Sequence, residues 1–201
     1  MAHSDAKSVV DGAVDSHLEH LRFINDEIHK NPELAYEEHK AHDTFVKLLT
    51  KLGYTVIPHA FGLETAFSAE YGSGGRLVIF NAEYDALPGI GHACGHNLIS
   101  SSSLAAFLGT AAALRESKSP GRVRLLGTPA EEGGGGKLKL IEAGAYKGCA
   151  ASLMVHPGPG YRLIRDLHHG RRIDTEKELP ALIHLKYHAA FPILRSIIKT
   201  A

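Results

Sequence analysis

The 201-residue sequence contains no tryptophan, only two cysteines and no excess of either charge. Two cysteines, Cys94 and Cys149, are too few for a disulfide scaffold, so the sequence favours an intracellular protein. The 22 basic and 22 acidic residues form no long run of one sign, which argues against nucleic-acid binding. No stretch approaches the roughly 20 apolar residues that cross a bilayer, and the polar start, residues 1–7, lacks the apolar segment of a signal peptide. We therefore expect a cytoplasmic protein that binds neither nucleic acid nor membrane.

The spacing of apolar residues predicts the order of helices and strands. Apolar residues recur every three or four positions over residues 6–30 and again over 33–52, which predicts two helices. Three short strands follow, and the Gly72–Gly75 cluster predicts a hairpin turn between the second and the third. The remaining elements alternate between helix and strand, so we predict an α/β domain with a mixed sheet flanked by helices. The predicted strands are 54–59, 65–71, 76–81, 123–126 and 151–155, and the later helices are 98–115 and 137–143.

Metal-binding residue types gather where these elements end or begin. Asp85 and the pair Glu131-Glu132 follow predicted strands, as does His156, whereas Cys94 and His96 precede a helix. Open α/β sheets place their sites at the carboxyl ends of strands, so we expect these side chains to lie close together. Thiolate, imidazole and carboxylate are the ligand types of a zinc-like ion. The sequence therefore predicts a metal site at this edge of the sheet.

The spacing of these residues also suggests how they share the chemistry. Cys94 and His96 are separated by one residue and, in extended backbone, can converge on one centre. Adjacent side chains on an extended segment point opposite ways, so one of Glu131 and Glu132 can bind metal while the other acts as a base toward water. Taken singly, Asp85 also fits a capping residue and the glutamates a solvated turn. Cys149 has no such neighbours, and we predict that it is a buried apolar residue.

The glycine run 133–136, followed by Lys137, suggests a phosphate-binding loop as an alternative. The spacing does not fit, because that motif would need glycine in place of Glu131 and serine or threonine in place of Leu138. We expect these glycines instead to let the backbone pass close to the metal site.

Four segments combine into a recognisable pattern: Asn31–Glu38, Glu83–Asn97, Gly127–Glu132 and Met154–Pro157. Together they resemble peptidase family M-20, the aminoacylase and carboxypeptidase G type, in its amidohydrolase–dipeptidase branch. Asn97 stands where many amidohydrolases carry aspartate. In this respect the sequence is similar to dipeptidases whose substrates include dipeptides with a basic C-terminal residue. The resemblance implies a zinc-peptidase-like catalytic domain.

The resemblance also implies roles for single residues. Glu131 would be the general base that moves a proton from water to the leaving amine, and Asp85 would support a ligand. Two divalent ions are implied, zinc first, with manganese or cobalt as alternatives. The implied substrates are dipeptides or N-acyl amino acids, and full-length relatives would form homodimers through a lid domain. The implied metal ligands are Cys94, His96, Glu132 and His156.

The family pattern continues beyond what this sequence matches. Relatives insert the lid domain after the segment that matches His156, and they supply a last histidine ligand near their C-terminus. We therefore expect an incomplete catalytic domain, with residues 1–160 as its N-terminal part and 161–201 as an irregular tail, a vestige of a lid that is essentially missing. The competing hypothesis is a catalytically inactive, truncated fragment that retains at most metal or partner binding.

Overall fold

A mixed β-sheet forms the centre of the molecule. The computed structural model describes residues 3–157. Within them, five strands form one sheet in the order β1-β2-β4-β3-β5. Strands β4, β3 and β5 are parallel, whereas β2 pairs antiparallel with both β1 and β4. The predicted α/β class with a mixed sheet is confirmed. The strands are β1 (Thr55–Pro58), β2 (Phe67–Ser73), β3 (Leu77–Ala82), β4 (Gly121–Gly127) and β5 (Cys149–Leu153).

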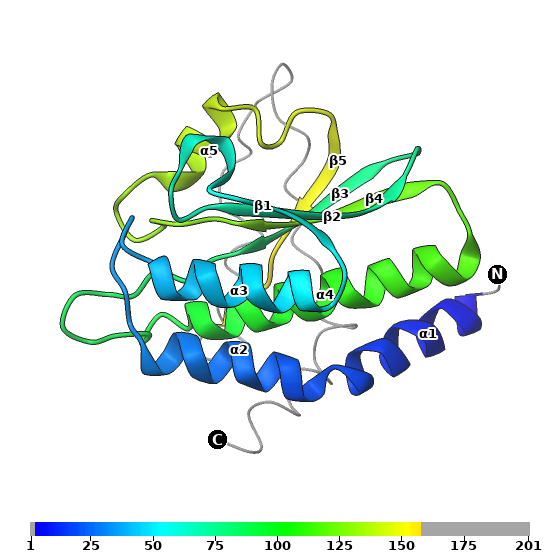
Figure 1. Cartoon of the computed structure of the whole chain (residues 1–201), viewed down its shortest axis with the longest axis horizontal. Coiled ribbons are helices and arrows are strands. Elements are labelled where there is room, and N and C mark those ends of the chain that lie inside the picture. The colour runs from blue at the N-terminus through cyan, green and yellow to red at the C-terminus, as the bar shows by residue number, and fades with distance from the viewer. Residues whose placement is uncertain (1–2, 158–201) are drawn as a thin grey trace, which may run out of the picture.

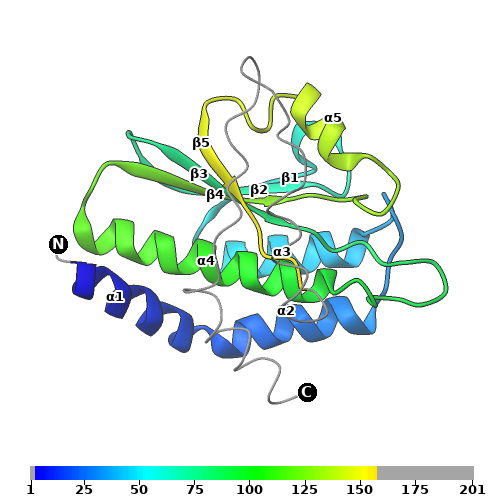
Figure 2. The ribbon, with the colours of Figure 1, turned by 180° about the vertical axis from the view of Figure 1, so that it is seen from behind.

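Helices cover both faces of this sheet (Figure 1). Helices α3 and α4 pack against one face, and α1 and α2 pack on the outside of α4. Helix α5 lies over the opposite face, as the view from behind in Figure 2 also shows. The helices are α1 (His3–Ser16), α2 (Leu18–Lys30), α3 (His39–Lys51), α4 (His96–Ser117) and α5 (Gly136–Glu142), with one 3-10 turn, η1 (Ala60–Gly62).

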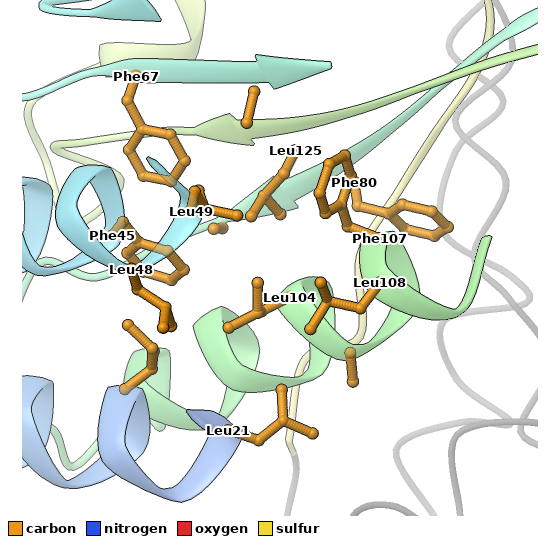
Figure 3. Close-up of a cluster of buried hydrophobic side chains, with 14 of the residues drawn as sticks. Leu21, Phe45, Leu48, Leu49, Phe67, Phe80, Leu104, Phe107, Leu108 and Leu125 are labelled. Atoms are coloured by element: carbon orange, nitrogen blue, oxygen red, sulfur yellow. The ribbon is translucent and has the colours of Figure 1, made fainter. Parts of the chain in front are cut away.

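The main core lies between the sheet and helices α3 and α4. Figure 3 shows Phe45 of α3 and Leu104 and Phe107 of α4 directed toward Phe67 and Leu125 of the sheet. All five side chains are fully buried, and the rings of Phe45 and Phe67 stack with their centroids 4.9 Å apart. Burying side chains of this size contributes about 1.5–3 kcal/mol each. This packing holds helix α4, whose first residue is His96, against the sheet.

Helix α4 is apolar along its length because it lies in the core. Within its 22 residues, an 18-residue stretch has a mean hydropathy of 1.3, so the helix is long and apolar enough by composition to cross a membrane. In this fold 67% of that stretch is buried inside the molecule, between the sheet and α1 and α2. A core helix covered on both sides has no need of a polar face, which accounts for its composition.

The predicted hairpin between β2 and β3 is wrong. Strand β4 lies between them and pairs with both. The glycines instead let the chain cross the start of β4, because a Cβ on Gly72 would lie 2.2 Å from the carbonyl oxygen of Gly121. A Cβ on Gly75 would lie 2.5 Å from the carbonyl oxygen of Pro120.

The first helix predicted from the sequence is in fact two helices. The break is at His17, where φ is −110° and ψ is 11°. The hydroxyl of Ser16 donates to the carbonyl of Ala13, and Nδ1 of His17 lies 2.7 Å from the same oxygen. These side chains compete for a carbonyl near the helix end, which favours termination there.

Helix α3 begins at His39, later than predicted. The carboxylate of Glu33 accepts the backbone N–H groups of Lys40 and Ala41, at 2.9 and 3.0 Å, and so caps the helix from outside it. Residues 33–38 consequently stay non-helical and run toward the strand ends.

Candidate metal centre

The predicted site residues come together at one edge of the sheet. Strands β3, β4 and β5 are parallel, so the loops that follow them leave the same edge. The loop after β3 carries Asp85, and the turn after β4 carries Glu131 and Glu132. His96 is the first residue of α4, which begins beside these loops.

Asp85 fixes the orientation of His96. Nδ1 of His96 lies 3.0 Å from Oδ1 of Asp85 and 2.8 Å from the Asp85 carbonyl oxygen, so it is the protonated nitrogen. The second carboxylate oxygen of Asp85 accepts the backbone N–H of Glu132 at 2.7 Å. Asp85 is itself fully buried. One carboxylate therefore holds both the imidazole and the turn that carries the glutamates.

The other ring nitrogen, Nε2 of His96, faces a group of metal-binding atoms. It is buried and has no hydrogen-bond partner among the residues that the structure describes. Ligand atoms of Cys94, His96 and Glu132 all lie within 4.8 Å of one another. Ligand atoms bound about 2.0–2.3 Å from zinc are themselves roughly 3.3–3.8 Å apart, so a small contraction would bring these three around one ion. The donor types and the free nitrogen lone pair fit a divalent metal.

A second group shares the same nitrogen. Glu83, His96 and Glu131 also place ligand atoms within 4.8 Å of one another. One carboxylate oxygen of Glu83 lies 3.3 Å from Nε2 of His96 and has no hydrogen-bond partner within residues 3–157. Lys137 forms an ion pair with the other oxygen. Glu83 is only 1% exposed, so a carboxylate with one unpartnered oxygen is buried next to the imidazole in the described structure.

The backbone around these residues differs from the extended form expected from sequence. Glu131 and Glu132 lie in a turn, and both reach to 3.7 Å from Nε2 of His96 rather than pointing opposite ways. The turn follows Ala130, whose φ is 58°. Cys94 and His96 do converge, but through Gly95, which adopts a left-handed conformation with φ 87°.

His156 lies beside this cluster but not inside it. Its ring centroid is 6.1 Å from that of His96, and it belongs to neither donor group formed by the described residues. Gly95 allows the approach of this segment, because a Cβ there would lie 2.4 Å from Cγ of Pro157. His156 thus reaches the neighbourhood of the site from β5.

The pKa shifts at this site reflect a competition between burial and hydrogen bonding. Burial, together with the charge of Glu132, raises the pKa of the Cys94 thiol to about 11. Burial alone would raise the pKa of Asp85, but its hydrogen bonds with His96 and with the Glu132 N–H outweigh that effect and lower it. Burial would likewise lower the pKa of His96, yet the hydrogen bond with Asp85 and the charge of Glu83 raise it. A bound cation would relieve these conflicts.

Three residues near this site have no role predicted from the sequence. Glu83 stands two positions before Asp85, and its place directly after an apolar strand is the signal that could have marked it. Glu38 and Tyr36 belong to the Asn31–Glu38 segment. Glu38 accepts the backbone N–H of Ala130, and Tyr36 donates to the carbonyl of Gly134.

The glycine run after the glutamates serves close backbone packing. A Cβ on Gly136 would lie 1.8 Å from the carbonyl oxygen of Pro129, and one on Gly134 would lie 2.5 Å from Cβ of Ala130. Lys137 is paired with Glu83 beside the donor cluster. Cys149, at the start of β5, is 7% exposed, which confirms its predicted burial.

The predicted tail, residues 161–201, lies outside the described residues.

Known proteins resemble this chain over the same region. Residues 79–177 match Peptidase family M20/M25/M40. The Xaa-Arg dipeptidases of Mus musculus and Homo sapiens are 46% and 44% identical over 157 and 161 residues. Each alignment covers 72% of this chain but only 36% or 37% of the relative, so the chain spans little more than a third of their length.

A solved structure shows the same fold. The YXEP protein of Bacillus subtilis, a dinuclear metal-binding peptidase of the M20 family, superposes with a TM-score of 0.60 and 29% identity. The match covers 74% of this chain and 44% of that one. The sheet order, the donor cluster at its edge and these similarities lead to one conclusion. The chain belongs to peptidase family M20/M25/M40.

Proposed function

We propose that this chain provides the metal centre of a metal-dependent hydrolase that cleaves the amide bond of dipeptides or N-acyl amino acids. The observation that carries the proposal is Nε2 of His96, a buried and unpartnered nitrogen in the described structure, surrounded by a thiol and three carboxylates. An imidazole held in this way by Asp85 is how proteins prepare a histidine for a metal. The names of the similar dipeptidases support an amide substrate.

The residues divide into ligands and a base. Cys94, His96 and Glu132 would hold one ion, with His156 approaching from β5. Thiolate, imidazole and carboxylate together suit zinc best, with manganese or cobalt as alternatives. Glu83 borders the space for a second ion. Divalent ions bound here would polarise the scissile carbonyl. They would also lower the pKa of a bound water to near neutrality.

We assign the role of general base to Glu131. Its side chain is 40% exposed, against 26% for Glu132, so it is the more open of the two glutamates. From this position its carboxylate would take a proton from the attacking water and give it to the leaving amine. Asp85 does not contact substrate in this scheme. It keeps His96 and the glutamate turn in register.

The names of the mouse and human relatives suggest the first substrates to test. Those proteins are Xaa-Arg dipeptidases, so we propose dipeptides with a C-terminal arginine.

The test compares wild type with Glu131→Gln, using purified protein supplied with zinc, manganese or cobalt and a panel of Xaa-Arg dipeptides. We expect the variant to retain metal and to lose turnover by about 10²–10⁴-fold, the usual contribution of a general base. Glu142→Gln on the exposed surface of α5 is the matched control and should behave as wild type.

A wild-type chain that binds metal but hydrolyses none of these dipeptides would contradict the proposed activity. That result would favour the second candidate, a metal-binding piece without catalysis. The observation behind this candidate is that the chain spans only 36–37% of the length of its dipeptidase relatives.

A further inference from the structure

The turn that carries Glu131 and Glu132 is held at both ends by one distant segment. Oε1 of Glu38 accepts the backbone N–H of Ala130 at 2.8 Å, immediately before the turn. The hydroxyl of Tyr36 donates to the carbonyl oxygen of Gly134, at its other end. Two side chains of residues 36–38 therefore bracket the pair of glutamates.

One residue on each side of this arrangement, Ala130 in the loop and Tyr36 in the distant segment, has an unfavourable backbone conformation. Ala130 has φ 58° and Tyr36 has φ 66°, the left-handed region that non-glycine residues seldom occupy. Such residues persist when their surroundings determine them, and they concentrate at functional sites. Ala130 is fully buried, so its N–H has no access to water and depends on Glu38. Losing that acceptor would free Ala130 to leave its strained conformation.

Both carboxylate oxygens of Glu38 accept hydrogen bonds. Its side chain is fully buried, and its other oxygen accepts the hydroxyl of Thr65 at 2.8 Å. Burial raises the pKa of Glu38, while the hydrogen bonds from Thr65 and Ala130 oppose that rise. A buried acid is costly, and Glu38 belongs to none of the ion pairs formed by the described residues, so its hydrogen bonds with Thr65 and Ala130 are what compensates its burial.

Packing against residues 36–38 leaves the turn little freedom to move on its own. A Cβ on Gly134 would lie 3.0 Å from Cε2 of Tyr36, so the turn lies directly against the ring. Nζ of Lys139, on α5, lies 4.1 Å from the centroid of the same ring on its face. The Tyr36 ring is thus fixed by α5 while its hydroxyl holds Gly134.

We propose that Tyr36 and Glu38 form a clamp that sets the position of Glu131 and Glu132 relative to His96. The two residues are positioning residues, because neither belongs to the donor groups around His96. The inference rests on the proposed hydrolase function for its consequence, the placement of base and ligand. The effect of the clamp on the mobility of the turn can be measured without metal.

The first measurement is amide hydrogen exchange in the metal-free chain, followed in a peptide covering residues 128–137. Glu38→Ala should raise exchange there about tenfold or more, because one buried N–H loses a charged acceptor. Glu38→Gln keeps an oxygen for the Ala130 N–H and should restore most of the protection. Thr65→Val removes the other partner of Glu38 and is the matched control, with protection of this peptide expected to remain.

A milder pair of variants covers the case in which Glu38→Ala fails to fold. Tyr36→Phe removes only the hydroxyl and should raise exchange in the same peptide. Tyr146→Phe also removes one tyrosine hydroxyl, which donates to Asn81 rather than to the turn, and should leave the peptide unchanged.

The second measurement is cobalt affinity and the cobalt absorption spectrum. Loss of a residue that supports a ligand costs about 10–100-fold in metal affinity, so Glu38→Ala should weaken cobalt binding by that factor and alter the spectrum, with rescue by Glu38→Gln. Unchanged exchange in the peptide, or an increase spread evenly over the chain, would overturn the clamp. A wild-type chain that binds no cobalt would instead overturn the proposed function, and the exchange data would still decide the clamp.

Discussion

Replacing Asp85 by asparagine should weaken metal binding without unfolding the protein. Asp85 accepts two hydrogen bonds, from Nδ1 of His96 at 3.0 Å and from the Glu132 N–H at 2.7 Å. Asparagine keeps one side-chain oxygen, so its amino group must face one of the two donors. The Asp85 carbonyl, 2.8 Å from Nδ1, remains as an acceptor and preserves the ring orientation. The loss therefore falls on the glutamate turn or on the basicity of the imidazole.

The size of this effect follows from what such supporting residues contribute. Their loss reduces metal affinity about 10–100-fold, or roughly 1.4–2.7 kcal/mol at 1.36 kcal/mol for each factor of ten. Competition with a chromophoric zinc chelator measures the change. Asp11→Asn, in an exposed ion pair with Lys7, is the control and should bind zinc as wild type does. An Asp85→Asn variant that folds and binds zinc as tightly as wild type would refute the supporting role.

Asp85 also makes a prediction about acid stability. Its pKa is lowered in the folded state, so its ionised form stabilises the fold above the unfolded-state pKa of about 3.9. That stability is lost as the pH falls through the lower folded-state pKa. Denaturant unfolding at a series of acidic pH values should therefore show a smaller loss of stability with acid in Asp85→Asn than in wild type, and equal slopes would contradict the assignment.

Three further predictions test the site and its surroundings. The Cys94 thiol has a pKa of about 11 without metal, and the thiolate is the ligand, so zinc binding should release a proton. Titrations in buffers of different ionisation enthalpy should show this release, and the zinc affinity should rise about tenfold per pH unit. Glu83→Gln should reduce bound metal from two ions to one by mass spectrometric metal analysis, and an unchanged content would exclude Glu83 from the centre. Gly127→Ala would place a Cβ 2.3 Å from Phe67 and 2.6 Å from the Tyr84 hydroxyl, so urea unfolding should show a loss of about 1–3 kcal/mol. Gly12→Ala, with open space around it, is the control and should lose no stability.

Local patterns in the sequence predict most of the fold. Strand β3 is predicted at 76–81 and observed at Leu77–Ala82, because its nearly continuous run of apolar residues marks a buried strand wherever it pairs. Pairing itself is not local. Gly72–Gly75 has the composition of a hairpin turn, yet β4, from much later in the chain, inserts between the two strands that this turn joins. Nothing near those glycines in the sequence indicates that insertion.

The candidate site likewise has features that the sequence reveals locally and features that depend on distant residues. Residue types that bind metal are recognisable wherever they occur, so Cys94, His96, Glu132 and His156 could be named from the sequence, and the structure brings the first three together. The role of Glu38 could not, because its partner Ala130 is 92 residues away. Glu83 is separated by 54 residues from Lys137, which holds it. Buried acids take their function from such distant partners, and the sequence shows only that the acids are there.

Cobalt absorption tests the central claim, that Cys94 and His96 belong to a metal centre, most directly. A thiolate bound to cobalt gives a charge-transfer band in the near ultraviolet, and the chain has one other cysteine, Cys149, which is buried at the start of β5. We predict that cobalt produces this band in wild type and in Cys149→Ser, and that Cys94→Ser abolishes it. A wild-type chain without the band, or a Cys94→Ser variant that keeps it, would contradict the metal centre described here.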